Sequence, residues 1–199
     1  MKPQWFKLFV PAFALAFTGT VPAAVVIDQD NTQFSDGIMS SFVNGSQLQS
    51  FQQAAGNIVG AGILLEGSGS ESITINLYDL LPLPESGATL LATGSAVGAG
   101  GSWVDVYWGE VSISPDTTYY LEFSGSNLAT AADLQNRYSR GIHYSSSLSG
   151  WPAYDLIFRT YANDTVVPEP GTYVMFLAGM GMIGAITRRR NLNGTSPAA

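Results

Sequence analysis

The chain has 199 residues, of which 46% are apolar and only 12% are charged. It contains no cysteine and a single histidine, which excludes a disulfide framework, a cysteine-ligated metal site, a thiol nucleophile and a site built on several histidines. Residues 24–167 carry three arginines against fourteen Asp and Glu residues, a net charge of −11. Because such a segment repels phosphate backbones, we expect no nucleic-acid binding.

The N-terminus, residues 1–23, has the order of parts that is typical of a secretory signal peptide. Lys2 and Lys7 provide positive charge, Leu8–Phe17 is a ten-residue apolar stretch, and small residues follow it. We therefore expect a signal peptidase to cut near Ala24. A buried N-terminal helix is the alternative interpretation.

The C-terminus, residues 168–190, is made of three parts in a fixed order. These parts are Pro168-Glu169-Pro170, the uncharged stretch Gly171–Thr187, and Arg188-Arg189-Arg190. As a helix, the 17 uncharged residues would be about 25 Å long, near the lower limit for a transmembrane span. The arginines would stay on the cytoplasmic side, which places residues 24–167 outside the membrane. An ordinary tail anchor with a proline-rich stem is the alternative.

This end of the chain resembles the PEP-CTERM sorting signal of Gram-negative bacteria that produce exopolysaccharide. The resemblance implies that an exosortase, a membrane transpeptidase, recognises Pro168-Glu169-Pro170 and removes the helix with its arginines. It also implies a protein that is first anchored in the inner membrane with its domain outside, and that is then found at the cell surface or secreted. Residues 191–199 form a polar tail that is longer than the family usually shows.

Residues 24–167 are predicted to form one all-β domain, an antiparallel β-sandwich of jelly-roll type. Polar and apolar residues alternate with period two in Glu71–Leu80 and Thr118–Ser124, which lie between Pro, Ser and Gly clusters. Further strands are expected at Ile58–Leu65, Trp103–Ile113, Gly141–Ser146 and Tyr154–Tyr161. Only Asn127–Asn136 has the character of a short helix.

Two of these segments carry a second, weaker resemblance. Tyr119–Leu121 and Asp155–Tyr161 look like parts of the domains that accompany diverse surface anchors in bacteria. That resemblance implies a β-sandwich and names no ligand.

The residues that catalysis would require are scarce. A serine nucleophile needs a positioned base, and the one imidazole, His143, lies where we expect an exposed strand or loop residue. No G-x-S-x-G nucleophile elbow is present. A glycoside hydrolase needs only two carboxylates, so the fourteen acidic residues leave that alternative open.

No metal or cofactor is expected either. Asp28, Asp30, Asn31 and Asp36 offer oxygen ligands that calcium could use, but the EF-hand spacing is absent and an acidic surface loop is the simpler interpretation. The pattern G-x-G-x-x-G occurs at 179–184, inside the apolar stretch and without a preceding strand, so it does not predict a dinucleotide site.

Aromatic residues give the best remaining indication of a ligand. If Trp103–Trp108 is a regular strand, Trp103 and Tyr107 share one face with Asp105 between them, and Trp108 points into the core. Apolar faces of sugars stack on such rings, and neighbouring carboxylates hold the hydroxyls. The candidate glycan-binding residues are Trp103, Asp105, Tyr107, Trp151 and Tyr154. Packing of these tryptophans in the core is the alternative.

These patterns together predict an exported, non-catalytic protein of the cell surface or extracellular matrix that binds or organises exopolysaccharide. The expected partners are signal peptidase, an exosortase-type transpeptidase, and the membrane before processing. A secreted, carboxylate-dependent glycoside hydrolase is one alternative. A purely structural matrix protein, whose folded domain would expose no aromatic residues, is the other.

Overall fold

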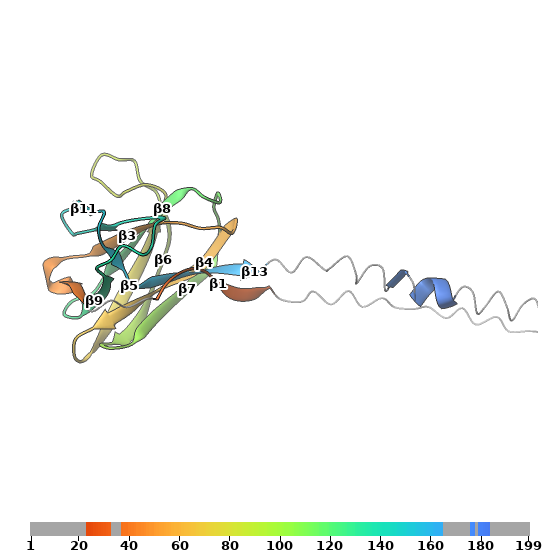
Figure 1. The fold of residues 1–199 in the computed structure, drawn as a ribbon, viewed down its shortest axis with the longest axis horizontal. Coiled ribbons are helices and arrows are strands. Elements are labelled where there is room, and N and C mark those ends of the chain that lie inside the picture. Colours follow the sequence, from red (N-terminus) through yellow and green to blue (C-terminus); the bar gives the residue numbers. More distant parts are fainter. Residues whose placement is uncertain (1–22, 33–36, 165–175, 178, 184–199) are drawn as a thin grey trace, which may run out of the picture.

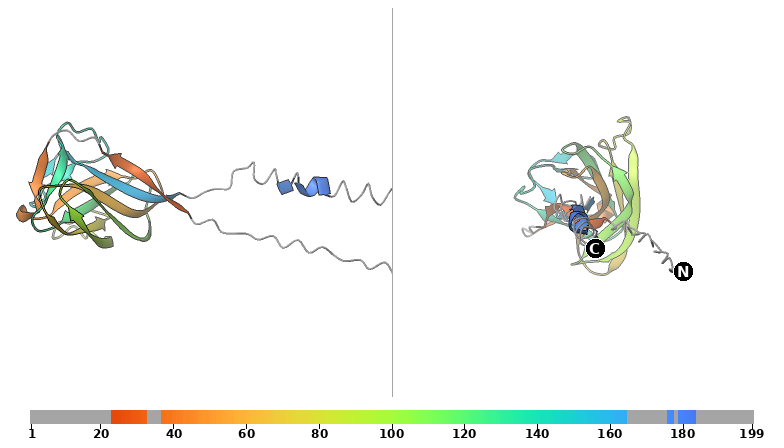
Figure 2. Two further views of the ribbon diagram at one scale, coloured as in Figure 1. Left: turned by 90° about the horizontal axis from the view of Figure 1, so that it is seen from below. Right: turned by 90° about the vertical axis from the view of Figure 1, so that its right-hand side faces the viewer.

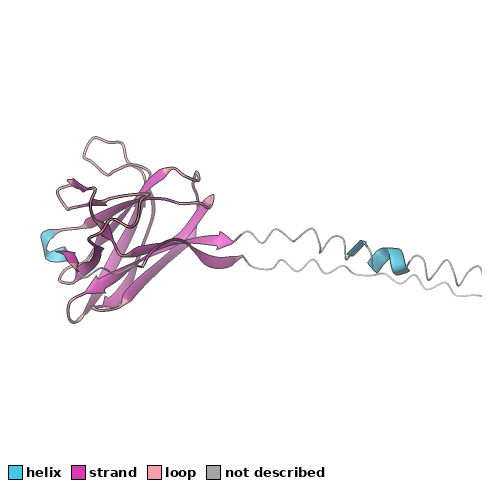
Figure 3. Ribbon diagram, viewed as in Figure 1, coloured by secondary structure: helices cyan, strands magenta, loops and turns pink. Residues whose placement is uncertain are grey.

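A computed structural model describes residues 23–32, 37–164, 176–177 and 179–183 (Figure 1). Within these ranges the chain is almost entirely β-structure, with one short 3-10 turn, η1 (Phe42–Asn44), and a few helical residues after position 175 (Figure 3). The strands are β1 (Ala24–Asn31), β2 (Ile38–Ser41), β3 (Gln47–Gln52), β4 (Asn57–Glu66), β5 (Ser70–Tyr78), β6 (Leu90–Ala99), β7 (Trp103–Ser112), β8 (Thr118–Ser124), β9 (Ala129–Asp133), β10 (His143–Tyr144), β11 (Gly150–Trp151), β12 (Asp155–Leu156) and β13 (Phe158–Asp164). The expected all-β class is confirmed.

The strands form two sheets, and all paired strands within each sheet are antiparallel. The seven-stranded sheet has the order β1-β13-β4-β9-β12, with β2 paired to β9 and β7 paired to β4. The six-stranded sheet has the order β11-β10-β3-β8-β5-β6. Because the chain passes repeatedly from one sheet to the other, the arrangement is the antiparallel sandwich that was predicted.

The core lies between the two sheets and follows from the alternation within the strands. In β5 and β8, every second residue points inward and is buried, and the residues between them stay partly exposed. The inward-facing side chains include Ile73, Ile75, Leu77, Leu121 and Phe123, which have no exposed surface. Burial of each such side chain stabilises the fold by about 1.5–3 kcal/mol relative to leaving it in water.

Most of the strands expected from the sequence are present. β8 has the predicted bounds, and β4, β5 and β7 differ from the predicted ranges by one or two residues at an end. The segment Tyr154–Tyr161 is divided at Ile157 into β12 and β13, which pair with different neighbours. The segment Gly141–Ser146 contains only the two-residue strand β10.

The predicted helix at Asn127–Asn136 is wrong. Its centre is β9, and all five residues of this strand are buried. β9 pairs with β2, β4 and β12, so it takes its hydrogen bonds from three neighbours in the seven-stranded sheet. The alanines that favour a helix in isolation fit here because both faces of the strand are covered and leave room only for small side chains.

The domain begins and ends at the same place, because Ala24 of β1 is paired with Asp164 of β13. Figures 1 and 2 show these two strands meeting at one end of the sandwich. Any attachment of the chain beyond residue 164 therefore holds the domain by this end.

The predicted terminal segments lie mostly outside the described residues. This applies to residues 1–22 of the signal peptide and to the predicted sorting residues Pro168, Glu169, Pro170, Arg188, Arg189 and Arg190. Most of the expected transmembrane helix over 171–187 also lies outside the described residues. Among the described residues, no helix is both long enough and apolar enough to cross a membrane.

Candidate functional site

The five candidate glycan-binding residues lie in two separate places. Trp103, Asp105 and Tyr107 are on β7 at the outer face of the seven-stranded sheet. Trp151 is in β11, at the edge of the six-stranded sheet, and Tyr154 lies just beyond it. The structure therefore keeps the three β7 residues together and does not bring the other two to them.

The register of the seven-stranded sheet places β13 residues beside those of β7, across β4. Gly62 is opposite both Asp105 and Arg159, and Gly60 is opposite both Tyr107 and Tyr161. Directly paired residues point to the same face of a sheet, so these side chains share the outer face.

The two glycines between the strands are required by this arrangement. A Cβ atom at Gly62 would overlap the Asp105 carboxylate, and one at Gly60 would lie 2.8 Å from Cδ1 of Tyr107. Because Gly60 and Gly62 carry no side chains, the side chains of β7 and β13 meet above this part of β4.

A fixed ion pair lies at the centre of this cluster. Asp105 accepts hydrogen bonds from Arg159 Nε at 2.8 Å and from the Tyr161 hydroxyl at 2.7 Å, and it forms an ion pair with Arg159 Nη2. The guanidinium carbon of Arg159 lies 4.2 Å from the centre of the Trp103 ring, which is a cation–π contact. The hydrogen bond to Asp105 raises the pKa of Arg159, so its charge is held.

Tyrosine rings form the second half of the cluster. Tyr107 has 55% of its surface exposed, and its ring centre lies 4.9 Å from that of Tyr161. Tyr161 is buried beneath it, and burial, followed by its hydrogen bond to Asp105, raises the pKa of its hydroxyl. We call Trp103, Asp105, Tyr107, Arg159 and Tyr161 the Tyr107 platform.

Arg159 and Tyr161 were not among the candidates from sequence. Both lie in the predicted closing strand and, being two residues apart, share a face of it. The sequence shows that Arg159 and Tyr161 share a face of their strand. It does not show that β13 pairs with β4, which places them beside β7.

The second aromatic pair is smaller. Trp151 has 46% of its surface exposed, and its ring centre lies 6.0 Å from that of Tyr154. Trp108, predicted to face the core, is partly buried and packs against it. Its indole nitrogen has no hydrogen-bond partner.

The expected exposure of His143 is wrong. The residue has only 2% of its surface exposed, because β10 pairs with β3 and turns this side chain inward. Its Nε2 atom lies 3.0 Å from the side-chain oxygen of Gln47. Burial lowers the pKa of the imidazole to about 4, so His143 is neutral and out of reach of a substrate.

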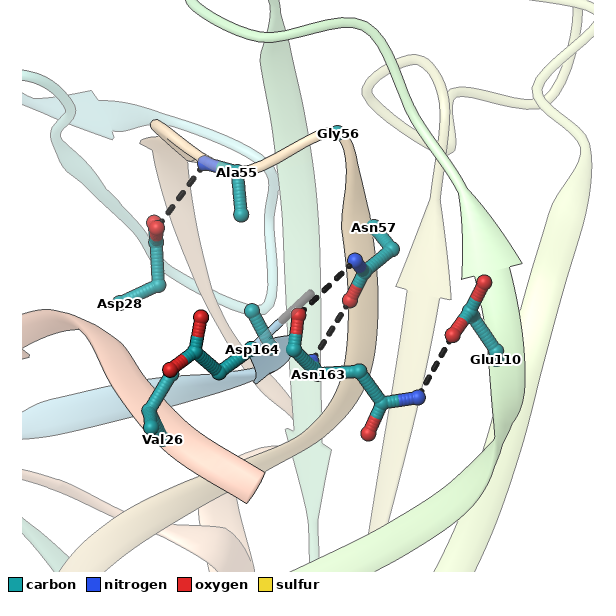
Figure 4. Close-up of a pocket in the computed structure, with 9 residues that line it drawn as sticks. Val26, Asp28, Ala55, Gly56, Asn57, Glu110, Asn163 and Asp164 are labelled. Carbon is teal, nitrogen blue, oxygen red and sulfur yellow. Dashed lines mark hydrogen bonds between the residues drawn. The ribbon is translucent and has the colours of Figure 1, made fainter. Parts of the chain in front are cut away.

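A pocket of about 520 Å³ lies near the end of the domain where β1 and β13 meet (Figure 4). It gathers three carboxylates, from Asp28, Glu110 and Asp164. Asp28 accepts hydrogen bonds from the backbone nitrogens of Ala54 and Ala55 at 2.8 and 2.9 Å. Glu110 accepts one from Asn163 Nδ2 at 2.6 Å, so two of the three acids hold loops and strands in place.

The described residues contain no group of three or more His, Cys, Asp or Glu residues placed to hold a metal ion. Of the oxygen ligands considered for calcium, Asn31 is buried and donates to the backbone oxygen of Leu156 at 2.7 Å. Asp36 lies outside the described residues.

The fold and the chain end together define a β-sandwich domain that is followed by a sorting segment. Residues 166–190 match the PEP-CTERM protein-sorting motif. The motif implies export, membrane anchoring through the C-terminal segment and processing by an exosortase-type membrane enzyme. No curated protein matches the chain.

Proposed function

We propose that the protein is a non-catalytic component of the cell surface or extracellular matrix whose domain, residues 24–167, binds exopolysaccharide through the Tyr107 platform. The exposed Tyr107 ring beside the fixed Asp105–Arg159 pair is the observation that carries the proposal. An aromatic ring packs on the apolar face of a sugar, while a fixed carboxylate and guanidinium bind its hydroxyls.

The net negative charge of the domain favours an uncharged polysaccharide as its ligand. The three arginines of the described residues each form an ion pair with a carboxylate: Arg137 with Asp133, Arg140 with Asp116, and Arg159 with Asp105. The described residues contain no other Lys or Arg, so the strongly acidic domain would repel an anionic polymer.

The buried positions of the perturbed acid and base support a non-catalytic role. Burial raises the pKa of Asp155 to about 6, in the range that suits a general acid. Asp155 is completely buried, however, and His143 is nearly so, so neither side chain touches the surface where a polysaccharide would lie. The carboxylates of Asp28 and Glu110, which line the pocket, are already engaged in structural hydrogen bonds.

Exposed aromatic side chains argue against a purely structural matrix protein. Tyr107 and Trp151 both present about half of their surface to solvent. These exposed rings are what a ligand site on the domain requires, whereas a purely structural matrix protein was expected to expose none. Glycan binding by Trp151 and Tyr154 stays a prediction, as a contact separate from the Tyr107 platform.

Replacing Tyr107 with alanine is expected to weaken binding to an uncharged polysaccharide by about ten-fold or more, because the exposed stacking surface is lost. Affinity gel electrophoresis of the full-length protein with galactomannan, hydroxyethyl cellulose or laminarin in the gel measures this. Tyr107→Phe keeps the ring and should retain binding. Val97→Ala, which changes an exposed residue of β6, serves as the control.

Two results would contradict the proposal. One is equal retardation of wild type and Tyr107→Ala on every uncharged polymer that binds. The other is preferential binding to the anionic polymer alginate. Release of reducing sugar that disappears on replacing Glu110 or Asp164 would instead favour the glycoside hydrolase.

Processing is a separate prediction that follows from the sorting motif at 166–190. We expect the mature protein to lack residues 1–23 and also the segment after Pro168-Glu169-Pro170. Intact-mass measurement of the protein recovered from its native host tests both cuts. A mature form that still carries Arg188-Arg189-Arg190 would contradict removal of the C-terminal segment.

A further inference from the structure

Three tyrosines, on strands β5, β8 and β10, lie at the outer face of the six-stranded sheet. Tyr78 of β5 is directly opposite Tyr120 of β8, and the rings of Tyr120 and Tyr144 are in edge contact with centres 5.9 Å apart. The neighbours of Tyr78 and Tyr120 along β5 and β8 are buried in the core, and His143 beside Tyr144 in β10 is buried as well. These three rings therefore point outward. All three are partly exposed.

A carboxylate is held rigidly beside these rings. Glu122 accepts hydrogen bonds from the Ser46 hydroxyl at 2.8 Å and from Asn76 Nδ2 at 3.0 Å. The Tyr78 hydroxyl lies 3.4 Å from its second oxygen. Because several donors fix this carboxylate, it has a defined position from which to accept hydrogen bonds from a ligand.

The side chains around the rings are hydroxyls and amides. Thr74 and Ser95 are hydrogen-bonded at 2.8 Å, and Thr93 donates to the side-chain oxygen of Asn76 at 2.6 Å. Apart from the rings, these side chains offer hydrogen-bonding groups rather than an apolar surface. Aromatic rings among hydroxyls, an amide and a fixed carboxylate are suited to the alternating apolar and hydroxylated surface of a sugar.

We propose that Tyr78, Tyr120 and Tyr144 with Glu122 and Asn76, the tyrosine face, form a second glycan-binding site. The two outer faces of a sandwich point in opposite directions, and the Tyr107 platform occupies the other one. The domain therefore binds two polysaccharide chains on opposite sides and cross-links them. This inference rests on the proposed function for the class of its ligand, which is an uncharged polysaccharide.

A bridging experiment separates two sites from one. The full-length protein is added to latex particles coated with galactomannan, hydroxyethyl cellulose or laminarin, and both bound protein and particle clustering are measured. Wild type should cluster the particles. Tyr78→Ala/Tyr120→Ala and Tyr107→Ala should each still bind but lose clustering, because bridging requires both faces and loss of bivalency lowers avidity by about 100-fold.

Tyr120 packs against Tyr144, which is paired with the buried Leu48, so the double variant is checked by thermal unfolding. Tyr78→Ser leaves the contact between Tyr120 and Tyr144 in place and is the variant to use if the double variant does not fold. Val97→Ala is the matched surface control.

The outcomes distinguish the two proposals. Clustering that persists in a folded tyrosine-face variant overturns the second site and leaves the Tyr107 platform unaffected. If clustering is lost only with the tyrosine-face variants and Tyr107→Ala behaves as wild type, the tyrosine face is retained as a binding site. The same result overturns both the Tyr107 platform and the cross-linking by two faces. No binding of wild type to any of the coatings overturns both.

Discussion

Replacing Asp155 with asparagine is expected to leave the free energy of unfolding nearly unchanged at pH 4 and to raise it by about 3 kcal/mol above pH 6. Burial raises the pKa of Asp155 in the folded protein to about 6 from 3.8, and Asp133 directly opposite it acts in the same direction. Between these values the folded state binds more protons, so its stability falls as the pH rises. Asparagine cannot ionise and removes that loss.

His143→Gln should show the opposite dependence. Burial lowers the pKa of His143 to about 4 from 6.5, so in this range the unfolded state binds more protons and stability rises with pH. The variant is expected to gain about 3 kcal/mol relative to wild type at pH 4 and nothing above pH 6.5. In the wild type the two dependences largely cancel.

Urea denaturation of both variants at intervals between pH 4 and pH 8 measures these differences. Glu85→Gln, in an exposed loop, removes a carboxylate without burial and should follow wild type. If the free energies of unfolding of Asp155→Asn and wild type differ by the same amount at every pH, the pKa of Asp155 is not raised by folding.

Strands with one buried and one solvated face are the easiest to predict from sequence, although β4, which is mostly buried on both faces, was also found. β5 and β8 alternate clearly, because their outward residues are polar or tyrosine and their inward residues are aliphatic or aromatic. β3 and β9 were missed because the alternation is absent there. β9 is buried on both faces, and the inner face of β3 carries Gln47 and Gln49, which read as surface residues in a sequence.

The candidate site was only partly predictable, because its residues come from two strands that are distant in the sequence. Parity within one strand was enough to place Trp103, Asp105 and Tyr107 on a common face, and the structure agrees. It was not enough to find Arg159, because strand order and register are set by the whole sheet. The exposure of His143 was mispredicted for a related reason, since its burial depends on a two-residue strand that pairs with β3.

Gln49 joins the two sheets through buried hydrogen bonds. Its side-chain nitrogen donates to Asp155 at 2.9 Å, and its oxygen accepts from the backbone nitrogen of Leu156 at 2.8 Å. All three residues are completely buried, so water cannot replace either bond. Gln49 therefore holds β12 against β3 and provides a donor to a buried carboxylate.

Gln49→Met preserves the length of the side chain but removes both hydrogen bonds, and we expect it to destabilise the fold by about 3–5 kcal/mol at pH 7. The cost comes from a buried carboxylate that loses the Gln49 donor and from a buried backbone nitrogen that is left without its partner. Because protonation relieves the first of these, the loss should be smaller at pH 4. Gln52→Met, on the partly exposed end of the same strand, is the matched control.

A double-mutant cycle with Asp155→Asn isolates the interaction between the two side chains. Once the carboxylate is replaced, Gln49→Met should cost about 1–3 kcal/mol, the share due to the backbone nitrogen of Leu156. An equal cost of Gln49→Met in both backgrounds would mean that Asp155 does not depend on Gln49. A coupling energy that disappears at pH 4 would instead show that the Gln49 amide acts by stabilising the ionised carboxylate. The hydrogen bond that connects the two sheets would then contribute to the pH dependence of the stability of the whole domain.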